Sequence, residues 1–303
     1  MLPCYQLTAL RHSIHDFRLN YTLPMHTVHD SGLGKPTLYS GQFDAGRLFP
    51  IPRANQRAGL GIGMGMGDAP VFFGGDIWNA YEFSWLDSRG RPRVALLRLD
   101  VPADSPNLIE SKSLKLYLNG FMQERVGDCA ALQAQLRLDL SAVAGAAVSV
   151  DLTAQPGGTA TAIDVMQGES IDAADVDIDH YGPPDAQVLR VDAQRLADET
   201  LTSEALKSNC PVTGQPDWAS LQIKYCGQRI DRGSLLRYLA GFREHADFHE
   251  HCVERIFIDL SQRCAPQSLF VYARYTRRGG IDINPWRSSA PRSAPANTRT
   301  PRQ

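Results

Sequence analysis

The chain repeats one helical segment, and this repeat limits the folds open to it more than any other feature. Residues 113–121 read S-L-K-L-Y-L-N-G-F, and residues 234–242 read S-L-L-R-Y-L-A-G-F. Six of the nine positions are identical, at an offset of 234 − 113 = 121 residues. Each segment has the apolar spacing of an amphipathic helix, follows candidate strands and precedes a second candidate helix. Chance similarity between two helices is the alternative, but the equivalent placement favours a duplicated module.

The elements of the module follow from apolar periodicity. Alternating apolar residues predict strands over 77–86 and 93–101, joined by a hairpin turn at 87–90. Helices are predicted over 109–121 and 129–143, and a further strand over 147–152. In the second half, Leu221, Ile223 and Tyr225 alternate with polar residues and predict a strand. The order predicts a module of two strands, two helices and further strands, present twice.

Composition divides the 303 residues into five segments. Residues 1–35 are expected to be a flexible N-terminal extension, with Met25 as an alternative start to Met1, and residues 36–154 to form the first module. Residues 155–186 mix Asp with Gly and Pro and are expected to be an acidic linker; they lack the EF-hand spacing of a calcium loop. Residues 187–288 are expected to form the second, catalytic module. The remaining residues, 289–303, contain arginines but no acid, which predicts a disordered basic tail.

Two short stretches in the first module break the periodicity. Residues 48–53 read L-F-P-I-P-R, and the two prolines predict an extended segment lying on a surface. Glycines alternate between Gly59 and Gly67, without the G-x-G-x-x-G spacing of a dinucleotide-binding turn. A flexible loop is the favoured interpretation of that stretch.

Charge and cysteine content exclude several classes of function. The formal charge is 31 − 33 = −2, so no bulk electrostatic attraction to nucleic acid or to a membrane is expected. No apolar run approaches the ~20 residues of a membrane span, and the first residues lack the apolar core of an export signal. The six cysteines form no C-x-x-C pair, which favours reduced thiols in a cytoplasmic protein.

A short loop in the second half carries the first candidate for chemistry. Cys210 directly precedes a proline, and Asp217 follows seven residues later inside a second proline turn. A thiol and a carboxyl group held on one tight loop are suited to act as nucleophile and proton donor. A structural cysteine in a turn is the alternative for this position taken alone.

A second candidate site begins near His245. His245, His249, His251 and Cys252 contain imidazole and thiol groups that zinc prefers, but neither H-E-x-x-H nor a paired-cysteine knuckle is present. The competing interpretation is that His249 and Glu250 begin a helix and face a ligand. A buried glutamate can accept two N–H bonds from a guanine-like edge. A solvated helix face remains the alternative.

Two further stretches have the character of phosphate sites. Glu110, Ser111 and Lys112 open the predicted helix of the first half, where backbone amides and a lysine can meet phosphate. Near the end of the chain, Arg278 follows another arginine and precedes Gly279, which offers a second such site.

Four of these motifs together resemble the NADPH-dependent 7-cyano-7-deazaguanine reductases, the nitrile reductases of queuosine biosynthesis. They are E-S-K-S-x-K at 110–115 continued by L-Y-L-N, the loop at 210–217, F-H-E at 248–250, and Y-T-R-R-G-G-I-D-I-N-P at 275–285. L-F-P-I-P-R and G-D-I-W at 75–78 are similar to the longer, two-module form of that family. The resemblance covers roughly residues 33–288, and the N-terminal residues, the glycine-rich loop and the tail depart from it.

The resemblance implies a fold and a setting. The fold is α+β, with tandem tunnelling-fold modules in which antiparallel sheets each carry a pair of helices. The reaction is reduction of a deazapurine nitrile to the primary amine with two NADPH. A cytoplasmic homodimer that acts on a small molecule, with no direct contact to nucleic acid or membrane, is the implied form.

The resemblance also assigns roles residue by residue. Cys210 would attack the nitrile carbon to form a thioimidate, and Asp217 would protonate the nitrogen. The residues implied to hold the deazaguanine are Ile109, Glu110, Ser111, His249 and Glu250. Those implied to bind NADPH are Ser111, Lys112, Arg278 and Gly279, and no metal is implied. Two other classes stay open from the residues alone: a zinc-dependent, cyclohydrolase-like pterin enzyme of the same fold, and a non-catalytic purine-binding protein.

Overall fold

The computed structural model describes residues 27–35, 41–62, 71–154 and 163–303. The possible start at Met25 and most of the glycine-rich loop, from Gly63 onward, lie outside the described residues.

The first module contains the elements that the sequence predicts. Strands β2 (Phe73–Leu86) and β3 (Pro92–Pro102) form an antiparallel hairpin, and Gly90 in its turn has a φ of +77° that favours glycine. Helices α2 (Ser111–Gly120) and α3 (Cys129–Ala144) follow, and then strand β5 (Ser149–Ala154) pairs with β3. Before the hairpin, β1 (Pro50–Pro52) and the short helix α1 (Ala54–Arg57) lead in, and β4 (Asn107–Ile109) precedes α2.

The second module has the same plan with longer strands. The strands are β6 (Glu169–Ser170), β7 (Val191–Ser203), β8 (Lys207–Asn209), β9 (Pro216–Ile230), β10 (Ser268–Tyr275) and β11 (Ile281–Ser288). The helices are α4 (Arg232–Ala240) and α5 (His249–Cys264). A pair of helices inserted between antiparallel strands recurs in both halves, so the α+β fold with a helix pair per module is confirmed.

The two modules start their first helix with equivalent hydrogen bonds. Glu110 is the N-cap of α2 and accepts from the Ser113 amide at 2.7 Å, while Asp231 is the N-cap of α4 and accepts from the Ser234 amide at 2.7 Å. The two N-cap residues are separated by 231 − 110 = 121 positions, the same offset as the repeated segment. A carboxylate in this place satisfies amides that have no partner within the helix.

A tyrosine then ties each helix pair together. Tyr117 of α2 donates to Asp139 of α3 at 2.7 Å, and Tyr238 of α4 donates to Asp259 of α5 at 2.6 Å. These are the tyrosines of the repeated nine-residue segment. The repeat is therefore a repeat of structure, because the same side chains make the same contacts in both halves.

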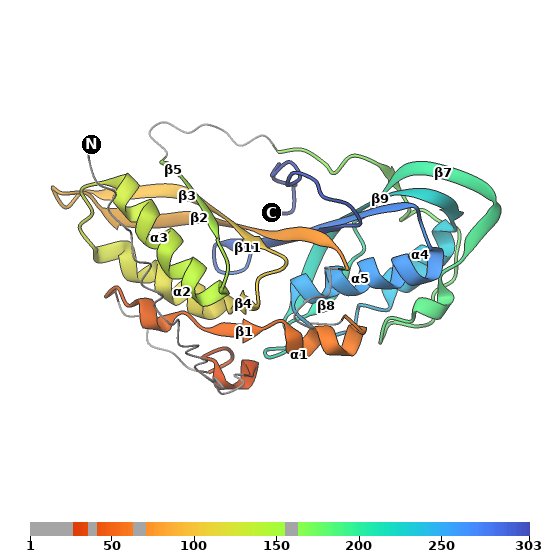
Figure 1. Cartoon of the computed structure of the whole chain (residues 1–303), viewed down its shortest axis with the longest axis horizontal. Coiled ribbons are helices and arrows are strands. Elements are labelled where there is room, and N and C mark those ends of the chain that lie inside the picture. Colours follow the sequence, from red (N-terminus) through yellow and green to blue (C-terminus); the bar gives the residue numbers. More distant parts are fainter. Residues whose placement is uncertain (1–26, 36–40, 63–70, 155–162) are drawn as a thin grey trace, which may run out of the picture.

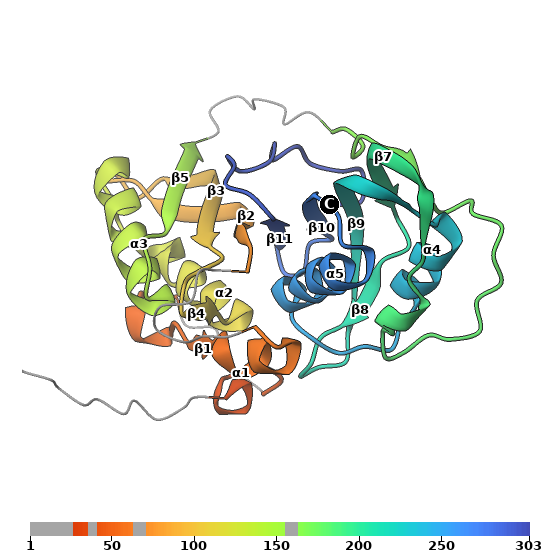
Figure 2. The same cartoon turned by 45° about the vertical axis from the view of Figure 1, so that its right-hand side comes forward.

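One continuous sheet joins the modules, rather than one sheet for each. The strand order is β5-β3-β2-β11-β10-β9-β7-β6, and β11 pairs antiparallel with β2 across the junction. Only the short β6–β7 pair is parallel among the described strands. The helix pairs lie on one face of this sheet (Figures 1 and 2).

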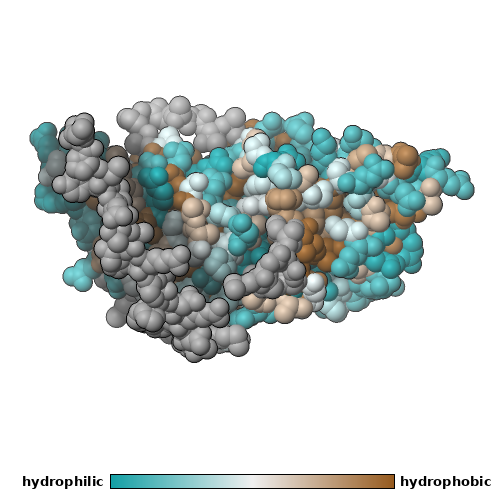
Figure 3. All heavy atoms as spheres, viewed as in Figure 1, coloured by the Kyte–Doolittle hydropathy of each residue, from teal (hydrophilic) through white to brown (hydrophobic). Residues whose placement is uncertain are grey.

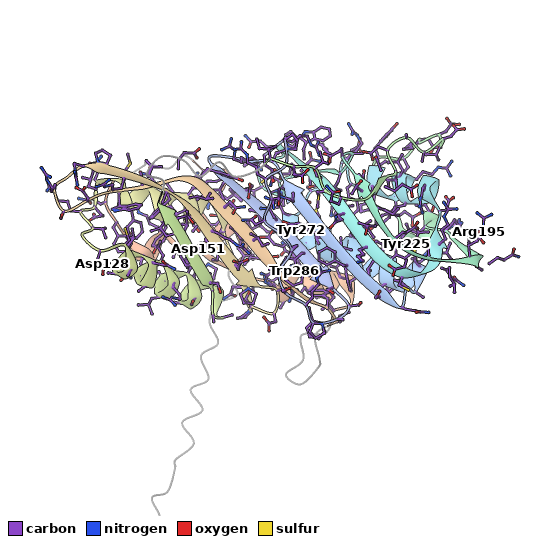
Figure 4. The ribbon with its side chains drawn as sticks, turned by 90° about the horizontal axis from the view of Figure 1, so that it is seen from above. Asp128, Asp151, Arg195, Tyr225, Tyr272 and Trp286 are labelled. Carbon is purple, nitrogen blue, oxygen red and sulfur yellow. The ribbon has the colours of Figure 1, made fainter. Side chains whose placement is uncertain are left out.

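Each helix pair buries its own apolar core against that face. Leu97, Leu114 and Leu136 are fully buried in the first core, and Val271, Ile256 and Leu235 in the second. A smaller cluster, which includes Tyr272 and Trp286, belongs to the opposite face, onto which Figure 4 looks.

The L-F-P-I-P-R stretch is extended as predicted, but it does not lie on the surface. β1 pairs with β4, and the side chains of Ile51 and Arg53 are 3% and 2% exposed. Arg53 reaches inward because it pairs with the buried carboxylate of Asp76 at 2.6 Å. An ion pair formed far along the chain thus overrides the local preference of a proline-rich segment for the surface.

A buried network of five charged side chains links α1, the sheet and α5. Arg287 of β11 bonds Asp76 of β2 at 2.8 Å and Glu254 of α5 at 2.8 Å, and Arg53 and Arg57 complete the set. Each of the five is at most 3% exposed. Buried charges persist only when they are paired in this way.

The segment before the first module and the tail after the second both differ from the predictions. Ser31 is buried, and Lys112 of α2 donates to the carbonyl of Gly32 at 2.9 Å, so residues 31–35 pack on the first module. In the tail, Arg292 lies 3.9 Å above the Phe270 ring, and Gln303 is 5% exposed. Gln303 donates to the Tyr275 carbonyl at 2.9 Å and accepts from Arg274 at 2.6 Å. The tail is ordered because the bare face of the sheet offers it aromatic rings and buried polar partners.

The connection at 163–186 has little regular structure: β6 pairs with β7, and Ile163 forms an isolated bridge with Arg299. The face of the molecule shown in Figure 3 is mostly hydrophilic, with hydrophobic residues in separate patches. Among the described residues, no helix combines the length and apolarity needed to cross a membrane.

Candidate active site

A pocket opens where the two modules meet, beside the β2–β11 pairing. Its apolar wall includes Trp78, Leu108 and Ile283. Its polar lining contains Ser111, Cys210, Asp217, His249, Glu250 and Arg278. With Ile109, which also lines the pocket, seven of the residues selected from the sequence come together from both halves of the chain.

The loop between β8 and β9 holds Cys210 and Asp217 at its two ends. The Cys210 amide donates to the Gln215 carbonyl at 2.9 Å, and the Gly214 amide donates back to the Cys210 carbonyl at 3.0 Å. Gly214 has a φ of +65°, which only glycine adopts at little cost. β8 pairs with β9 directly below this turn, so the thiol and the carboxyl group are held rigidly.

The surroundings of Cys210 favour its thiolate. Burial would raise the pKa of Cys210, but hydrogen bonds and a nearby charge outweigh burial and lower that pKa. The hydrogen bonds come from the Thr213 hydroxyl and the amides of Thr213 and Val212, and the charge is that of Arg278. Burial instead raises the pKa of Cys252 and raises the pKa of Cys264 to about 11. Since the thiolate is the nucleophile, Cys210 is better prepared for attack than these two cysteines.

Asp217 contacts an arginine and a histidine in the pocket wall. Its side chain is 3% exposed; Arg278 Nη1 donates to Oδ1 at 2.7 Å, and His249 Nε2 lies 3.3 Å from Oδ2. Burial would raise the pKa of Asp217, but His249 and Arg278 together lower it. The carboxyl group is therefore ionised at neutral pH, whereas the role of proton donor expected for it requires a protonated carboxyl group.

His249 and Glu250 open helix α5 at the rim of the pocket. His249 stacks on Tyr275, a residue for which the sequence suggested no role although it begins one of the motifs. Glu250 is 3% exposed, and no side chain of another described residue donates a hydrogen bond to it or forms an ion pair with it. Burial and the nearby Asp76 raise the pKa of Glu250, opposed by His249 and Arg53. A buried carboxyl group that lines a pocket and has no side-chain donor among the described residues is suited to bind a ligand that offers N–H groups.

The motif at the start of α2 is divided between the pocket and the helix. Ile109 and Ser111 line the pocket. Glu110 caps α2 instead, accepting from the amides of Lys112 and Ser113 at 2.7 Å each. The ammonium of Lys112 contacts the carbonyls of Gly32 and Lys35, so neither Glu110 nor Lys112 lines this pocket.

The turn between β10 and β11 places Arg278 in the lining of the pocket, whereas Gly279 lies outside that lining. The Arg278 amide donates to the Ile281 carbonyl at 2.9 Å, and Gly279 and Gly280 have φ values of +62° and +80°. A second cavity of about 180 Å³ lies beside this turn, lined by Gly279, Gly280 and Lys115 among others.

Lys115 is the site residue that the sequence reasoning missed. Burial and the neighbouring Arg278 lower the pKa of Lys115, and a Cβ added to Gly279 would lie 3.3 Å from its side chain. It stood in the E-S-K-S-x-K motif, five residues after Glu110, which was the available signal. A glycine turn flanked by Lys115 and Arg278 fits the phosphates of a nucleotide cofactor, since both side chains offer N–H donors and positive charge.

The candidate zinc residues do not converge. His249 faces Asp217, while His251 Nδ1 lies 3.2 Å from Asp247. Within the described ranges, no group of three or more His, Cys, Asp or Glu side chains has the arrangement of a metal site.

The fold and the pocket define a class of protein: an α+β chain with two helix pairs on one sheet and, where its two halves meet, a pocket lined by a cysteine and an aspartate. Residues 39–152 match the family described as nitrile reductase, 7-cyano-7-deazaguanine-reductase N-terminal domain, and residues 216–294 match the family described as QueF-like protein. The chain belongs to the 7-cyano-7-deazaguanine reductase family, as the motifs suggested.

Several relatives match almost end to end. The NADPH-dependent 7-cyano-7-deazaguanine reductase of Stenotrophomonas maltophilia strain R551-3 is 55% identical over 90% of this chain and 98% of its own. Those of Bordetella avium and Bordetella pertussis are 54% and 51% identical over 90% and 91% of this chain, and 98% and 100% of their own. The solved apo archaeosine synthase QueF-Like matches at a TM-score of 0.29 and 12% identity, over 34% of this chain and 100% of its own.

Proposed function

We propose that this protein reduces the nitrile of 7-cyano-7-deazaguanine to the primary amine 7-aminomethyl-7-deazaguanine with two NADPH, in queuosine biosynthesis. The observation that carries the proposal is the pairing of a thiol of lowered pKa, Cys210, with Asp217 in one pocket of a chain from this family. The same pocket contains a buried carboxyl group, Glu250, to which no side chain of another described residue donates, as binding of a guanine-like edge requires.

Covalent attachment solves the central difficulty of the reaction, because a nitrile is a poor hydride acceptor. The Cys210 thiolate forms a C–S bond to the nitrile carbon while one C–N π bond breaks, and the nitrogen takes a proton to give a thioimidate. Asp217, at the other end of the same loop, is the group proposed to deliver that proton. NADPH supplies hydride; four electrons are needed for the amine, hence two cofactors.

The pocket walls divide the recognition of the substrate. Glu250 is proposed to accept N–H bonds from the pyrimidine edge, with His249 beside it and Ile109 and Ser111 on the opposite wall. Glu110 does not line the pocket and is proposed to act through the helix start that it caps, which fixes the positions of Ile109 and Ser111.

The cofactor is proposed to lie between α2 and the β10–β11 turn, held by Ser111, Lys112, Arg278 and Gly279, with Lys115 added from the structure. The side chain of Arg278 is 30% exposed and so is accessible from outside the pocket. Lys112 can join only if it exchanges its present carbonyl partners for phosphate oxygens.

The wider assignments are proposals of the same kind. Residues 36–154 and 187–288 are proposed to be tunnelling-fold modules of a cytoplasmic homodimer that acts on a small molecule and not on nucleic acid. The duplicated helix pairs support the two modules, and the formal charge of −2 supports action on a small molecule and not on nucleic acid. Sedimentation of the purified protein would test the dimer directly.

The decisive test is NADPH oxidation that depends on 7-cyano-7-deazaguanine and yields the aminomethyl product. Activity should be unchanged after exhaustive chelation. Loss of activity that zinc restores would favour a cyclohydrolase-like enzyme, and tight binding of the nitrile without any turnover would favour a purine-binding protein.

A further inference from the structure

The arginine expected to bind the cofactor is bonded to the carboxylate expected to donate the proton. Arg278 Nη1 donates to Asp217 Oδ1 at 2.7 Å, and its Nη2 donates to the Gln215 side chain on the same loop. The two partners differ in access: Arg278 is 30% exposed, whereas Asp217 is 3% exposed. A ligand arriving from solvent therefore meets the arginine first.

The contact between Arg278 and Asp217 conflicts with the proposed role of Asp217 as a proton donor. Asp217 is faced by Arg278 from the β10–β11 turn, His249 from α5, Lys115 from α2 and Cys210 from its own loop. With His249 and Arg278 in contact, the pKa of Asp217 is lowered and the group carries no proton to give at neutral pH. Burial is the largest influence on that pKa and acts to raise it; once the arginine has left, His249 is the one group of the two in contact that still opposes burial.

We propose that Arg278 is shared between Asp217 and the phosphates of the cofactor, so that cofactor binding draws the guanidinium away and lets Asp217 take up the proton that it delivers. The inference rests on the function proposed above. Phosphate competes well for a guanidinium, since it offers more charge and more acceptor oxygens than a carboxylate.

The proton balance of the reaction fits this handover. The nitrogen takes up two protons in the whole reaction. One is taken when the thioimidate forms, before any hydride arrives; the first hydride then leads to expulsion of the Cys210 thiolate and needs no proton, and the second hydride leaves a nitrogen that needs one. The proton that cofactor binding loads onto Asp217 is the one for this second reduction, whereas the thioimidate forms without the cofactor. The handover also keeps Arg278 beside Cys210 before the cofactor arrives, when the thiolate is needed.

The test measures protons taken up on binding of NADP⁺, which cannot reduce the substrate. Titration calorimetry in buffers of different ionisation enthalpy gives this number, and the Cys210→Ala variant is used throughout so that the thiol does not contribute. We expect uptake near neutral pH to be larger, by up to about one proton, in Cys210→Ala than in Cys210→Ala/Asp217→Asn. Protonation of the cofactor's own phosphate is common to both variants and cancels in the difference.

Two neighbouring arginines provide a matched pair. Cys210→Ala/Arg278→Met should lose the extra uptake, because the carboxyl group no longer has a guanidinium to surrender. Cys210→Ala/Arg277→Met should keep it, since Arg277 pairs with the exposed Glu82 at 3.5 Å and not with Asp217.

The outcomes separate this inference from the function beneath it. Equal proton uptake by Cys210→Ala and Cys210→Ala/Asp217→Asn on NADP⁺ binding would overturn the proposed sharing of Arg278. It would not contradict the proposed reductase function. Failure of NADP⁺ to bind Cys210→Ala at all would count against the proposed function itself.

Discussion

The ring of His249 lies flat on the ring of Tyr275, with centroids 3.9 Å apart and an interplanar angle of 13°. Tyr275 ends β10 and is fully buried, whereas His249 begins α5, so the stack joins the sheet to the helix start at the pocket. It sets the direction in which His249 Nε2 meets Asp217, at 3.3 Å. Tyr275 is therefore a positioning residue, acting on the site through His249.

Replacing Tyr275 tests this relationship. Tyr275→Phe retains the ring and should keep near-normal turnover, whereas Tyr275→Leu should lower kcat by roughly tenfold or more, because a general acid–base group loses its alignment. Steady-state kinetics across pH are the measurement. A merely structural role would lower stability in both variants without moving the pH dependence of kcat, and that result would contradict the assignment.

Cys210 should form the covalent bond to the substrate. Mixed with 7-cyano-7-deazaguanine in the absence of NADPH, the protein should gain one adduct with the mass of the intact nitrile, because addition to a triple bond expels nothing. NADPH should then release the adduct as the amine. Cys210→Ala should bind the nitrile but show neither adduct nor turnover, and Cys210→Ser should be nearly inactive. Peptide mass spectrometry that placed the adduct on Cys252 would remove the mechanism.

The rate of adduct formation should rise with pH and level off below the value of about 8.5 typical of an unperturbed thiol. The reason is that the pKa of Cys210 is lowered, so the thiolate is present at a lower pH than in an ordinary cysteine. Thr213→Val removes a hydroxyl that stabilises the thiolate and should move the midpoint to higher pH. Thr153→Val, on β5 of the first module, serves as the control, and an equal shift in both variants would argue against the role of Thr213.

Glu250→Gln should weaken binding of the nitrile substrate more than binding of NADPH. A carboxylate accepts from two donors, whereas an amide offers one acceptor and one opposing donor. Losing a charged hydrogen bond costs ~1.5–3 kcal/mol, which is roughly ten- to a hundredfold in affinity. Calorimetry with each ligand separately provides the comparison; parallel weakening of both would show that Glu250 acts on the fold and not on the substrate.

Glu254→Gln should destabilise the protein by about 3–5 kcal/mol, because it leaves buried arginines without their shared partner. Burial opposes ionisation of Glu254, but Arg287 and Arg57 lower its pKa to about 2. A lowered folded-state pKa stabilises the protein above the unfolded value of about 4.3, and this contribution is lost as pH falls towards 2. Chemical denaturation across that window is the measurement. Glu169→Gln, in a pair with 62% exposure at the glutamate, should cost under about 1 kcal/mol.

Much of the fold was readable from local pattern. The repeated segment, the hairpin at 87–90 and the four long helices come from periodicity and turn residues, which depend on neighbours a few positions apart. The loop that joins Cys210 to Asp217 was readable for the same reason, since its ends are seven residues apart. The family followed from motifs that are themselves short.

The errors fell where distant parts of the chain meet. Arg53 is buried because it pairs with Asp76. The basic tail, expected to be disordered, packs on the bare face of the sheet through Arg292 and Gln303. Composition predicts solvation for both segments, because it contains no information about the partners that packing will provide.

The sequence by itself therefore determined the repeated helical segment, the loop from Cys210 to Asp217 and the residue types of the pocket. Tertiary structure alone decided that His249 would rest on Tyr275, that Lys115 would border Gly279, and that Arg278 would bond to Asp217. Arg278 and Asp217 are 61 residues apart, and Arg57 and Glu254 are 197 apart. Contacts at such separations exist only once tertiary packing has brought the β10–β11 turn beside the start of β9, and α1 beside α5, since no local preference of either residue specifies the other.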